Sequence, residues 1–135
     1  MFMALQTKSM SAEPSAQDGL RICVMRDSRI YNRHLKSFQQ KFHRPMYDKQ
    51  LKLLAPPIWL KNDYKEGKIS WEDYVPIFKR EVLEKYSGLI KAISYFAMKT
   101  DITLLCSEKT PEQCHRRLLA EECKKYQPNL ELILE

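Results

Sequence analysis

The sequence predicts an α/β domain with a small, mainly parallel sheet of about three or more strands, flanked by helices in a Rossmann-like layering. Residues 20–26, 101–106 and 130–134 are short apolar segments with the composition of strands. Helical patterns separate them, and strands that alternate with helices favour a parallel sheet. The chain has 135 residues, 44% of them hydrophobic, which suits one domain with a real core.

The ends of this domain follow from composition. Residues 1–19 show no sustained period, and Ser, Ala, Gln and Pro dominate their second half, so we expect a flexible tail before a single domain over 20–135. No segment approaches the roughly 18 apolar residues of a membrane span. The chain also lacks the features of an export signal. We therefore expect a cytoplasmic protein, without a membrane partner, whose four cysteines are reduced.

The first half of the domain begins with the strand "LRICVMR", residues 20–26, which follows Gly19. Both of its alternate sets contain apolar residues, so the strand is expected to be covered on both faces. Periodicity is weak over the next thirty residues or so, where we expect helical turns near 32–42 and 46–54.

Three helices are predicted in the second half. "IWLKNDYKEGK", from residue 58, is a short helix closed by Gly67. Ser70 and Asp73 form a capping box that starts the next helix. A third runs from about 88 to 99, and its inward side chains are expected to be Leu89, Ile90, Ile93, Phe96 and Ala97.

The last strand-turn-helix unit carries the most chemistry. Cys106 ends its strand, and the sequence T-P-E-Q from Thr110 has the pattern of a capping box that starts a helix reaching about Tyr126. Ligands of open α/β sheets bind at the carboxyl ends of strands. A helix N-terminus also attracts anions and lowers the pKa of a nearby thiol. We therefore expect a site here.

Five residues within eleven positions could carry that site: Cys106, Glu108, Cys114, His115 and Arg116. In one interpretation a cysteine is the nucleophile, His115 is its base and Arg116 binds an anion. In the plainer alternative His115 is a hydrogen-bonded core residue, the cysteines fill space as small hydrophobes, and Arg116 pairs with a carboxylate.

Two further interpretations involve a bound group. Cys106, Cys114 and His115, with Glu108, could bind zinc. Neighbouring helical residues diverge by about 100°, however, so we expect no metal, and the sequence names no cofactor. Alternatively the site only holds a phosphate-bearing or other anionic ligand. A phosphatase or rhodanese loop is a poor match, since Arg116 stands ten residues after Cys106.

Net charge is +6, and it is concentrated in residues 26–52, which hold eight basic and two acidic residues. A basic patch favours an anionic partner, and Arg26 and Arg33 are the candidate ligand-binding residues. A nucleic-acid-binding module is the alternative, in which interleaved aromatics stack on bases. These aromatics are Tyr31, Phe38, Phe42 and Tyr47. In the plainer alternative the basic residues form a solvated surface and the aromatics belong to the core.

Residues 104–120 resemble a family of uncharacterised proteins, domain of unknown function 488. Its signature is close to L-L-C-x-E-x-x-P-x-x-C-H-R-x-x-L-A, which "LLCSEKTPEQCHRRLLA" matches. Residues 53–86 are similar to one branch of the family, and the resemblance spans roughly 20–134. Members often carry D-V-R after the first strand; here Arg26 matches the arginine and Val24 replaces the acid. The resemblance implies a compact α/β domain and supplies no established reaction.

We therefore expect an enzyme or an anion-binding domain with a Cys/His/Arg site at residues 104–116. A nucleic-acid-binding module that uses residues 26–52 is one alternative. A small interaction domain whose Cys/His cluster is structural is the other.

Overall fold

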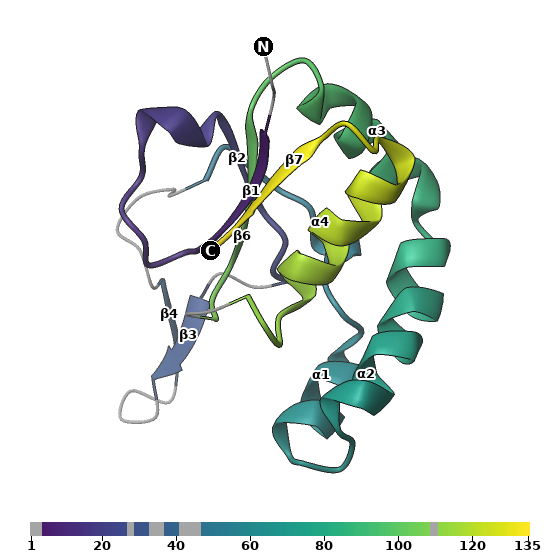
Figure 1. The fold of residues 1–135 in the computed structure, drawn as a ribbon. Coiled ribbons are helices and arrows are strands. Elements are labelled where there is room, and N and C mark those ends of the chain that lie inside the picture. The colour runs from purple at the N-terminus through teal and green to yellow at the C-terminus, as the bar shows by residue number, and fades with distance from the viewer. Residues whose placement is uncertain (1–3, 27–28, 33–36, 41–46, 109–110) are drawn as a thin grey trace.

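A five-stranded parallel sheet forms the centre of the molecule, as a computed structural model shows (Figure 1). The structure describes residues 4–26, 29–32, 37–40, 47–108 and 111–135. The strands stand in the order β5-β2-β6-β1-β7, and every described pairing in this sheet is parallel. The predicted α/β class is confirmed. The strands are β1 (Ala4–Ser9), β2 (Leu20–Cys23), β5 (Lys49–Gln50), β6 (Ile102–Cys106) and β7 (Glu131–Leu134).

Four α-helices accompany the sheet: α1 (Ile58–Lys65), α2 (Trp71–Phe78), α3 (Ser87–Ala97) and α4 (His115–Tyr126). The short 3-10 helices η1 (Ala16–Asp18) and η2 (Lys52–Leu54) lie in connections. The π-helical segment η3 (Lys79–Glu84) joins α2 to α3. A separate antiparallel hairpin pairs β3 (Arg29–Asn32) with β4 (Ser37–Gln40). No helix within the described ranges is long and apolar enough to cross a bilayer.

The main core lies between the sheet and the helices. Ile102, Leu104 and Cys106 alternate along β6 and belong to this core, together with side chains from all four helices. Leu105 points to the opposite face, where it packs with Met10 and Cys23. The central strand β6 is therefore buried on both faces, as its continuous apolar sequence predicts.

Residues 4–18 do not form the flexible tail that was expected over residues 1–19, and residues 1–3 lie outside the described residues. β1 lies between β6 and β7 and pairs with both of them. The sequence did not predict this strand because Gln6 and Lys8 are polar. Both side chains are satisfied by the segment that follows: Gln6 donates to the Gln17 carbonyl at 2.7 Å, and Lys8 donates to Asp18 at 2.6 Å.

Several element boundaries also need correction. The described parts of the segments expected to be helical, 32–42 and 46–54, contain β4, β5 and only the short η2, while 33–36 and 41–46 lie outside the described residues. The last helix begins at His115, because Cys114 has an extended backbone (φ −131°, ψ 141°). Thr110 lies outside the described residues. Phe96 is 55% exposed and does not face inward, unlike Ile90, Ile93 and Ala97.

Two predicted local motifs are confirmed. Ser70 caps α2, since its hydroxyl accepts the Asp73 N–H at 3.1 Å and the Asp73 carboxylate accepts the Ser70 N–H at 3.3 Å. Gly67 follows α1 with φ 75°. Gly19 also has a positive φ, 63°, and an added Cβ would lie 2.0 Å from the Asp101 carbonyl oxygen. Only glycine therefore fits at the entry to β2.

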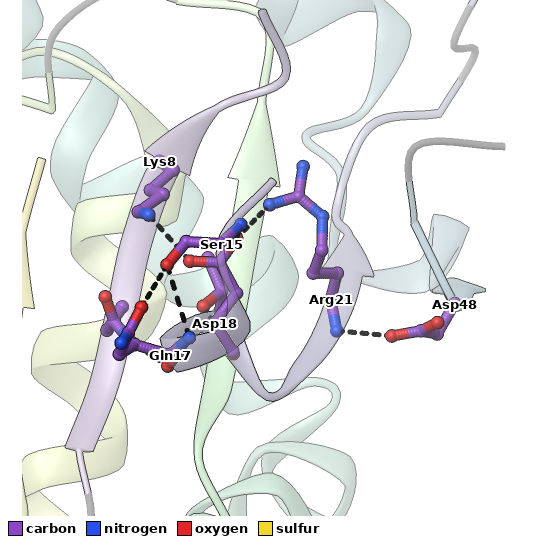
Figure 2. A network of polar contacts seen from close by, with 8 residues as sticks. Lys8, Ser15, Gln17, Asp18, Arg21 and Asp48 are labelled. Atoms are coloured by element: carbon purple, nitrogen blue, oxygen red, sulfur yellow. Dashed lines mark hydrogen bonds and ion pairs between the residues drawn. The ribbon is translucent and has the colours of Figure 1, made fainter. Parts of the chain in front are cut away.

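A buried carboxylate holds the connection from β1 to β2 (Figure 2). Asp18 is fully buried and accepts from Lys8 at 2.6 Å, from the Ser15 N–H at 2.9 Å and from the Arg21 guanidinium. The Asp18 carbonyl accepts the Thr103 hydroxyl at 2.7 Å, which ties this connection to β6. Burial alone would raise the pKa of Asp18, but these donors outweigh burial and lower it.

We predict that Asp18→Asn lowers the free energy of unfolding by about 3–5 kcal/mol, because two buried cations lose their counter-charge. Urea denaturation at pH 7 measures this. Glu66→Gln is the matched control, since Glu66 pairs with Lys68 where both side chains are more than half exposed. Its effect should stay below about 1 kcal/mol. Equal losses in the two variants would contradict the structural role of Asp18.

The same network predicts a pH dependence. The pKa of Asp18 is lower in the folded state, so its contribution is present above the unfolded pKa of about 3.9 and is lost as pH falls through the folded value. Asp18→Asn should therefore flatten the fall in stability that the unsubstituted protein shows in this acid range.

Candidate functional site

A cleft of about 1040 Å³ opens at the carboxyl ends of β2 and β6. Residues from the turn before α4 form its floor, and α1 and α2 contribute side chains to its walls. Arg26 and Cys106, which come from the ends of the two strands, both line it. The cleft thus opens where the strand-turn-helix pattern predicts a site.

Cys106 and His115 meet at the floor of this cleft. Cys106 is 4% exposed, and its Sγ lies 3.8 Å from His115 Nδ1. His115 Nε2 lies 2.8 Å from the Val24 carbonyl oxygen. Because a carbonyl can only accept, Nε2 carries a proton, and Nδ1 is left to exchange a proton with the thiol. This is the arrangement of an activated cysteine.

The surrounding groups favour a thiolate at Cys106. The neighbouring Cys114 thiol, together with the charge of His115 and the Glu108 backbone N–H, holds the pKa of Cys106 well below its ordinary value despite burial. Burial would lower the pKa of His115, but the Cys106 thiolate raises it. The neighbouring Cys106 and burial raise the pKa of Cys114. These shifts favour a Cys106 thiolate beside a charged His115 and a protonated Cys114.

Cys114 is better placed for joint ligation with His115 than the sequence suggests. It precedes the helix on extended backbone, so the divergence of about 100° between helical neighbours does not apply to it. The ligand atoms of Cys106, Cys114 and His115 lie within 4.8 Å of one another. Two thiolates and an imidazole with one open position are a donor set that fits zinc. The Val24 carbonyl would orient the imidazole of such a centre.

Glu108 serves the site through its backbone. Its carbonyl accepts from Arg116 at 2.8 Å, and its N–H contributes to the low pKa of Cys106. Its exposed side chain lines the cleft. Glu108 does not belong to the group of close ligand atoms formed by Cys106, Cys114 and His115.

Arg116, predicted to bind an anion, faces the protein instead. It is fully buried and does not line the cleft. Its guanidinium donates to the Glu108 carbonyl at 2.8 Å, to the Glu135 backbone oxygen at 3.0 Å and to Cys114 Sγ at 3.4 Å. It therefore holds the turn that carries the site against the end of β7. A sequence motif cannot reveal this direction, because either role requires an arginine.

The cleft is basic along its walls. Arg26, Lys52, Lys61 and Lys65 line it, and Glu108 is the acidic residue among its described lining. Arg26 was predicted from the sequence, but Lys61 and Lys65 of α1 were missed, since they lie outside the basic segment. Arg33 lies outside the described residues. Most charged side chains of 26–52 do too, so a nucleic-acid surface there stays a prediction.

Aromatic residues of α1 and α2 also line the cleft. Trp71 and Tyr74 stack with ring centroids 4.9 Å apart, and Tyr64 contacts both rings. The Tyr64 hydroxyl donates to Gln113 at 2.6 Å and so joins α1 to the turn before α4. Helical spacing alone does not distinguish residues that line a cleft, such as Trp71 and Tyr74, from residues of a core face.

The aromatics expected to stack on bases have varied outcomes. Tyr47 is half-buried, packs against the cluster of Met10, Cys23 and Leu105, and also lines the cleft. Phe42 and the side chains of Tyr31 and Phe38 lie outside the described residues.

The fold and the site define a small α/β domain with a thiol–imidazole pair at the end of a central strand. A family model described as "DUF488-N3a: Active DUF488-N3 subclade" matches residues 5–127, so the chain belongs to the DUF488 family, the domain of unknown function 488. The match begins within β1, in agreement with the place of that strand in the sheet. No curated protein and no solved structure matches the chain.

We predict that Arg116→Ala lowers the free energy of unfolding by at least about 3 kcal/mol, because each buried acceptor left unsatisfied costs about 1–3 kcal/mol. Arg26→Ala is the control: its side chain is exposed, and the change should stay within about 0.5 kcal/mol. Urea denaturation compares the two. A stable Arg116→Ala variant would show that this guanidinium does not hold the turn.

Proposed function

We propose that this protein is an enzyme that uses Cys106 as a thiolate nucleophile on a substrate carrying a phosphate or another anionic group. One observation carries the proposal. Cys106 Sγ lies 3.8 Å from His115 Nδ1, while His115 Nε2 is held at 2.8 Å by the Val24 carbonyl, on the floor of an accessible cleft.

The chemistry follows from the protonation states of the pair. The Cys106 thiolate attacks an electrophilic phosphorus or carbon, so that a bond to sulfur forms and the bond to the leaving group breaks. The His115 imidazolium gives its proton to the leaving group. Neutral His115 then accepts a proton from water, which attacks the covalent intermediate and releases the thiolate. The net reaction is hydrolysis of the substrate.

The walls of the cleft support an anionic substrate. The lining of the cleft contains four basic residues and the acidic Glu108. The positive electrostatic field of the cleft therefore attracts negative groups toward Cys106. Arg26 is the basic residue contributed by the end of the neighbouring strand, and Lys65 comes from α1. Arg116 supports this chemistry from behind by fixing the turn.

A catalytic zinc centre is the second candidate, favoured by the three ligand atoms within 4.8 Å. Bound zinc would hold both cysteines as thiolates and would supply a Lewis acid at the floor of the cleft. Cys106 could not then act as a free nucleophile. The two candidates therefore make opposite predictions for thiol reactivity.

We predict that one thiol, Cys106, is alkylated by iodoacetamide with a pH midpoint well below the ordinary value of about 8.5. His115→Gln removes the cationic partner and should raise that midpoint, which lowers the rate at pH 7 by at least about tenfold. Stopped-flow alkylation, followed by mass spectrometry to locate the label, measures both. Cys123→Ala is the control and should change neither value, because Cys123 is buried in the core.

Elemental analysis of untagged protein accompanies this titration. About one zinc per chain, with Cys106 unreactive until a chelator is added, would replace the nucleophile with the metal centre. A metal-free protein whose Cys106 titrates near the ordinary pKa would exclude the activated thiolate.

The basic cleft predicts a preference for anionic reagents. Iodoacetate should label Cys106 faster relative to iodoacetamide than it labels a small free thiol, and this ratio should fall as salt increases. Arg26→Gln and Lys65→Gln should each lower the ratio about twofold or more. Lys68→Gln removes the same charge outside the cleft lining and should leave the ratio unchanged. An equal effect of all three substitutions would argue against a directed anion site.

A further inference from the structure

Cys106 and Cys114 are close enough to react with each other. Their sulfur atoms lie within 4.8 Å of each other. Both residues line the cleft, so a small oxidant that enters it can reach them. We propose that these two cysteines form a redox site, in which a hydroperoxide oxidises Cys106 and Cys114 closes the product to a disulfide. The inference rests on the closeness of the two sulfur atoms and on their access from the cleft, and it does not depend on the substrate of the proposed function.

The first step is the reduction of the peroxide. The Cys106 sulfur attacks one peroxide oxygen, so that an S–O bond forms and the O–O bond breaks. The departing alkoxide or hydroxide takes a proton from the His115 imidazolium and leaves as an alcohol or water. Cys106 is oxidised to a sulfenic acid.

The second step uses Cys114. Its sulfur attacks the Cys106 sulfur, the S–S bond forms and the S–O bond breaks. The hydroxide that leaves takes the proton of the Cys114 thiol and becomes water. In total, two thiols and one hydroperoxide give one disulfide, one alcohol or water from the peroxide, and one further water. A dithiol reductant reverses the change.

The local backbone favours closure. Cys114 stands on extended backbone just before α4, so closure of a disulfide with Cys106 does not require a helical turn to unwind. The Arg116 guanidinium lies 3.4 Å from Cys114 Sγ and can stabilise the negative charge that develops there during attack.

The other two cysteines do not compete for Cys106. Cys23 packs with Met10 and Leu105 on the face of the sheet opposite the helices. Cys123 lies in the core on α4, where its thiol donates to the Ile90 carbonyl and burial raises its pKa to about 12. Oxidation is therefore expected to be selective for one pair.

The sequence offers a direct assay. Trypsin cleaves after Lys109, between the two cysteines, so a disulfide joins two separate peptides, residues 100–109 and 110–116. Reduced protein is treated with a chelator, which is then removed, and with one equivalent of hydrogen peroxide. Remaining thiols are alkylated, and the digest is analysed without reductant. We expect the linked peptides as the main oxidised product, and their loss on addition of dithiothreitol.

Two variants sharpen the test. Cys114→Ser should stop the reaction at the sulfenic acid, which dimedone labels on Cys106. Cys123→Ala should form the linked peptides as the unsubstituted protein does. A Cys106 that goes to sulfinic acid in the unsubstituted protein, without the linked peptides, would overturn the inference, as would preferential oxidation of Cys23.

The outcome separates this inference from the proposed function. A Cys106 that is alkylated rapidly at pH 7 but forms no disulfide leaves the nucleophile in place and removes only the redox role. A Cys106 that reacts slowly with both iodoacetamide and peroxide removes both proposals.

Discussion

The hydrogen bond from His115 Nε2 to the Val24 carbonyl is the contact on which the site depends. It joins the end of β2 to the start of α4, across 91 positions of sequence, at a distance of 2.8 Å. It fixes both the orientation and the protonation of the imidazole, and so directs Nδ1 toward Cys106. The partner is a backbone carbonyl, and the Val24 side chain is free to be fully buried in the core. The absence of an acid at position 24 therefore does not leave the imidazole without an orienting acceptor.

Arg116 explains how the turn before α4 holds Cys114 in place close to Cys106. A buried guanidinium is costly unless its donors are satisfied. Here Nη1 bonds to Glu108 and Cys114, and Nε and Nη2 bond to Glu135. The three acceptors come from the turn and from the segment after β7. Adjacent residues of α4 thus have different roles. His115 faces the cleft and takes part in the proposed chemistry, whereas Arg116 faces inward and holds the turn before α4 in place.

The sequence predicts those parts of the structure that depend on local pattern. The apolar run of β6, the capping box at Ser70 and the cluster from Cys106 to Arg116 were all located from residue types and spacing. What it could not predict depends on distant partners. β1 ends in four consecutive polar residues, Gln6 to Ser9, and Lys8 is accommodated in the sheet by its ion pair with the buried Asp18. Likewise the place of Lys61 and Lys65 could not be predicted, because α1 reaches the cleft only through the fold. The cleft opens at the end of β6, which lies about forty residues further along the chain.

The groups that stabilise a buried thiolate at Cys106 allow only one chemical role of the site at a time. A thiolate that is only 4% exposed loses most of its hydration, and the Cys114 thiol, the His115 charge and the Glu108 N–H replace it. Each of the alternatives removes part of this support. Binding of zinc would displace the thiol proton of Cys114. A disulfide would join the two sulfur atoms and leave neither thiol free. A thiolate nucleophile, a metal centre and a disulfide therefore exclude one another in the same three side chains. The state of Cys114, rather than that of Cys106, decides among them, because its proton is the one that only the nucleophilic state retains.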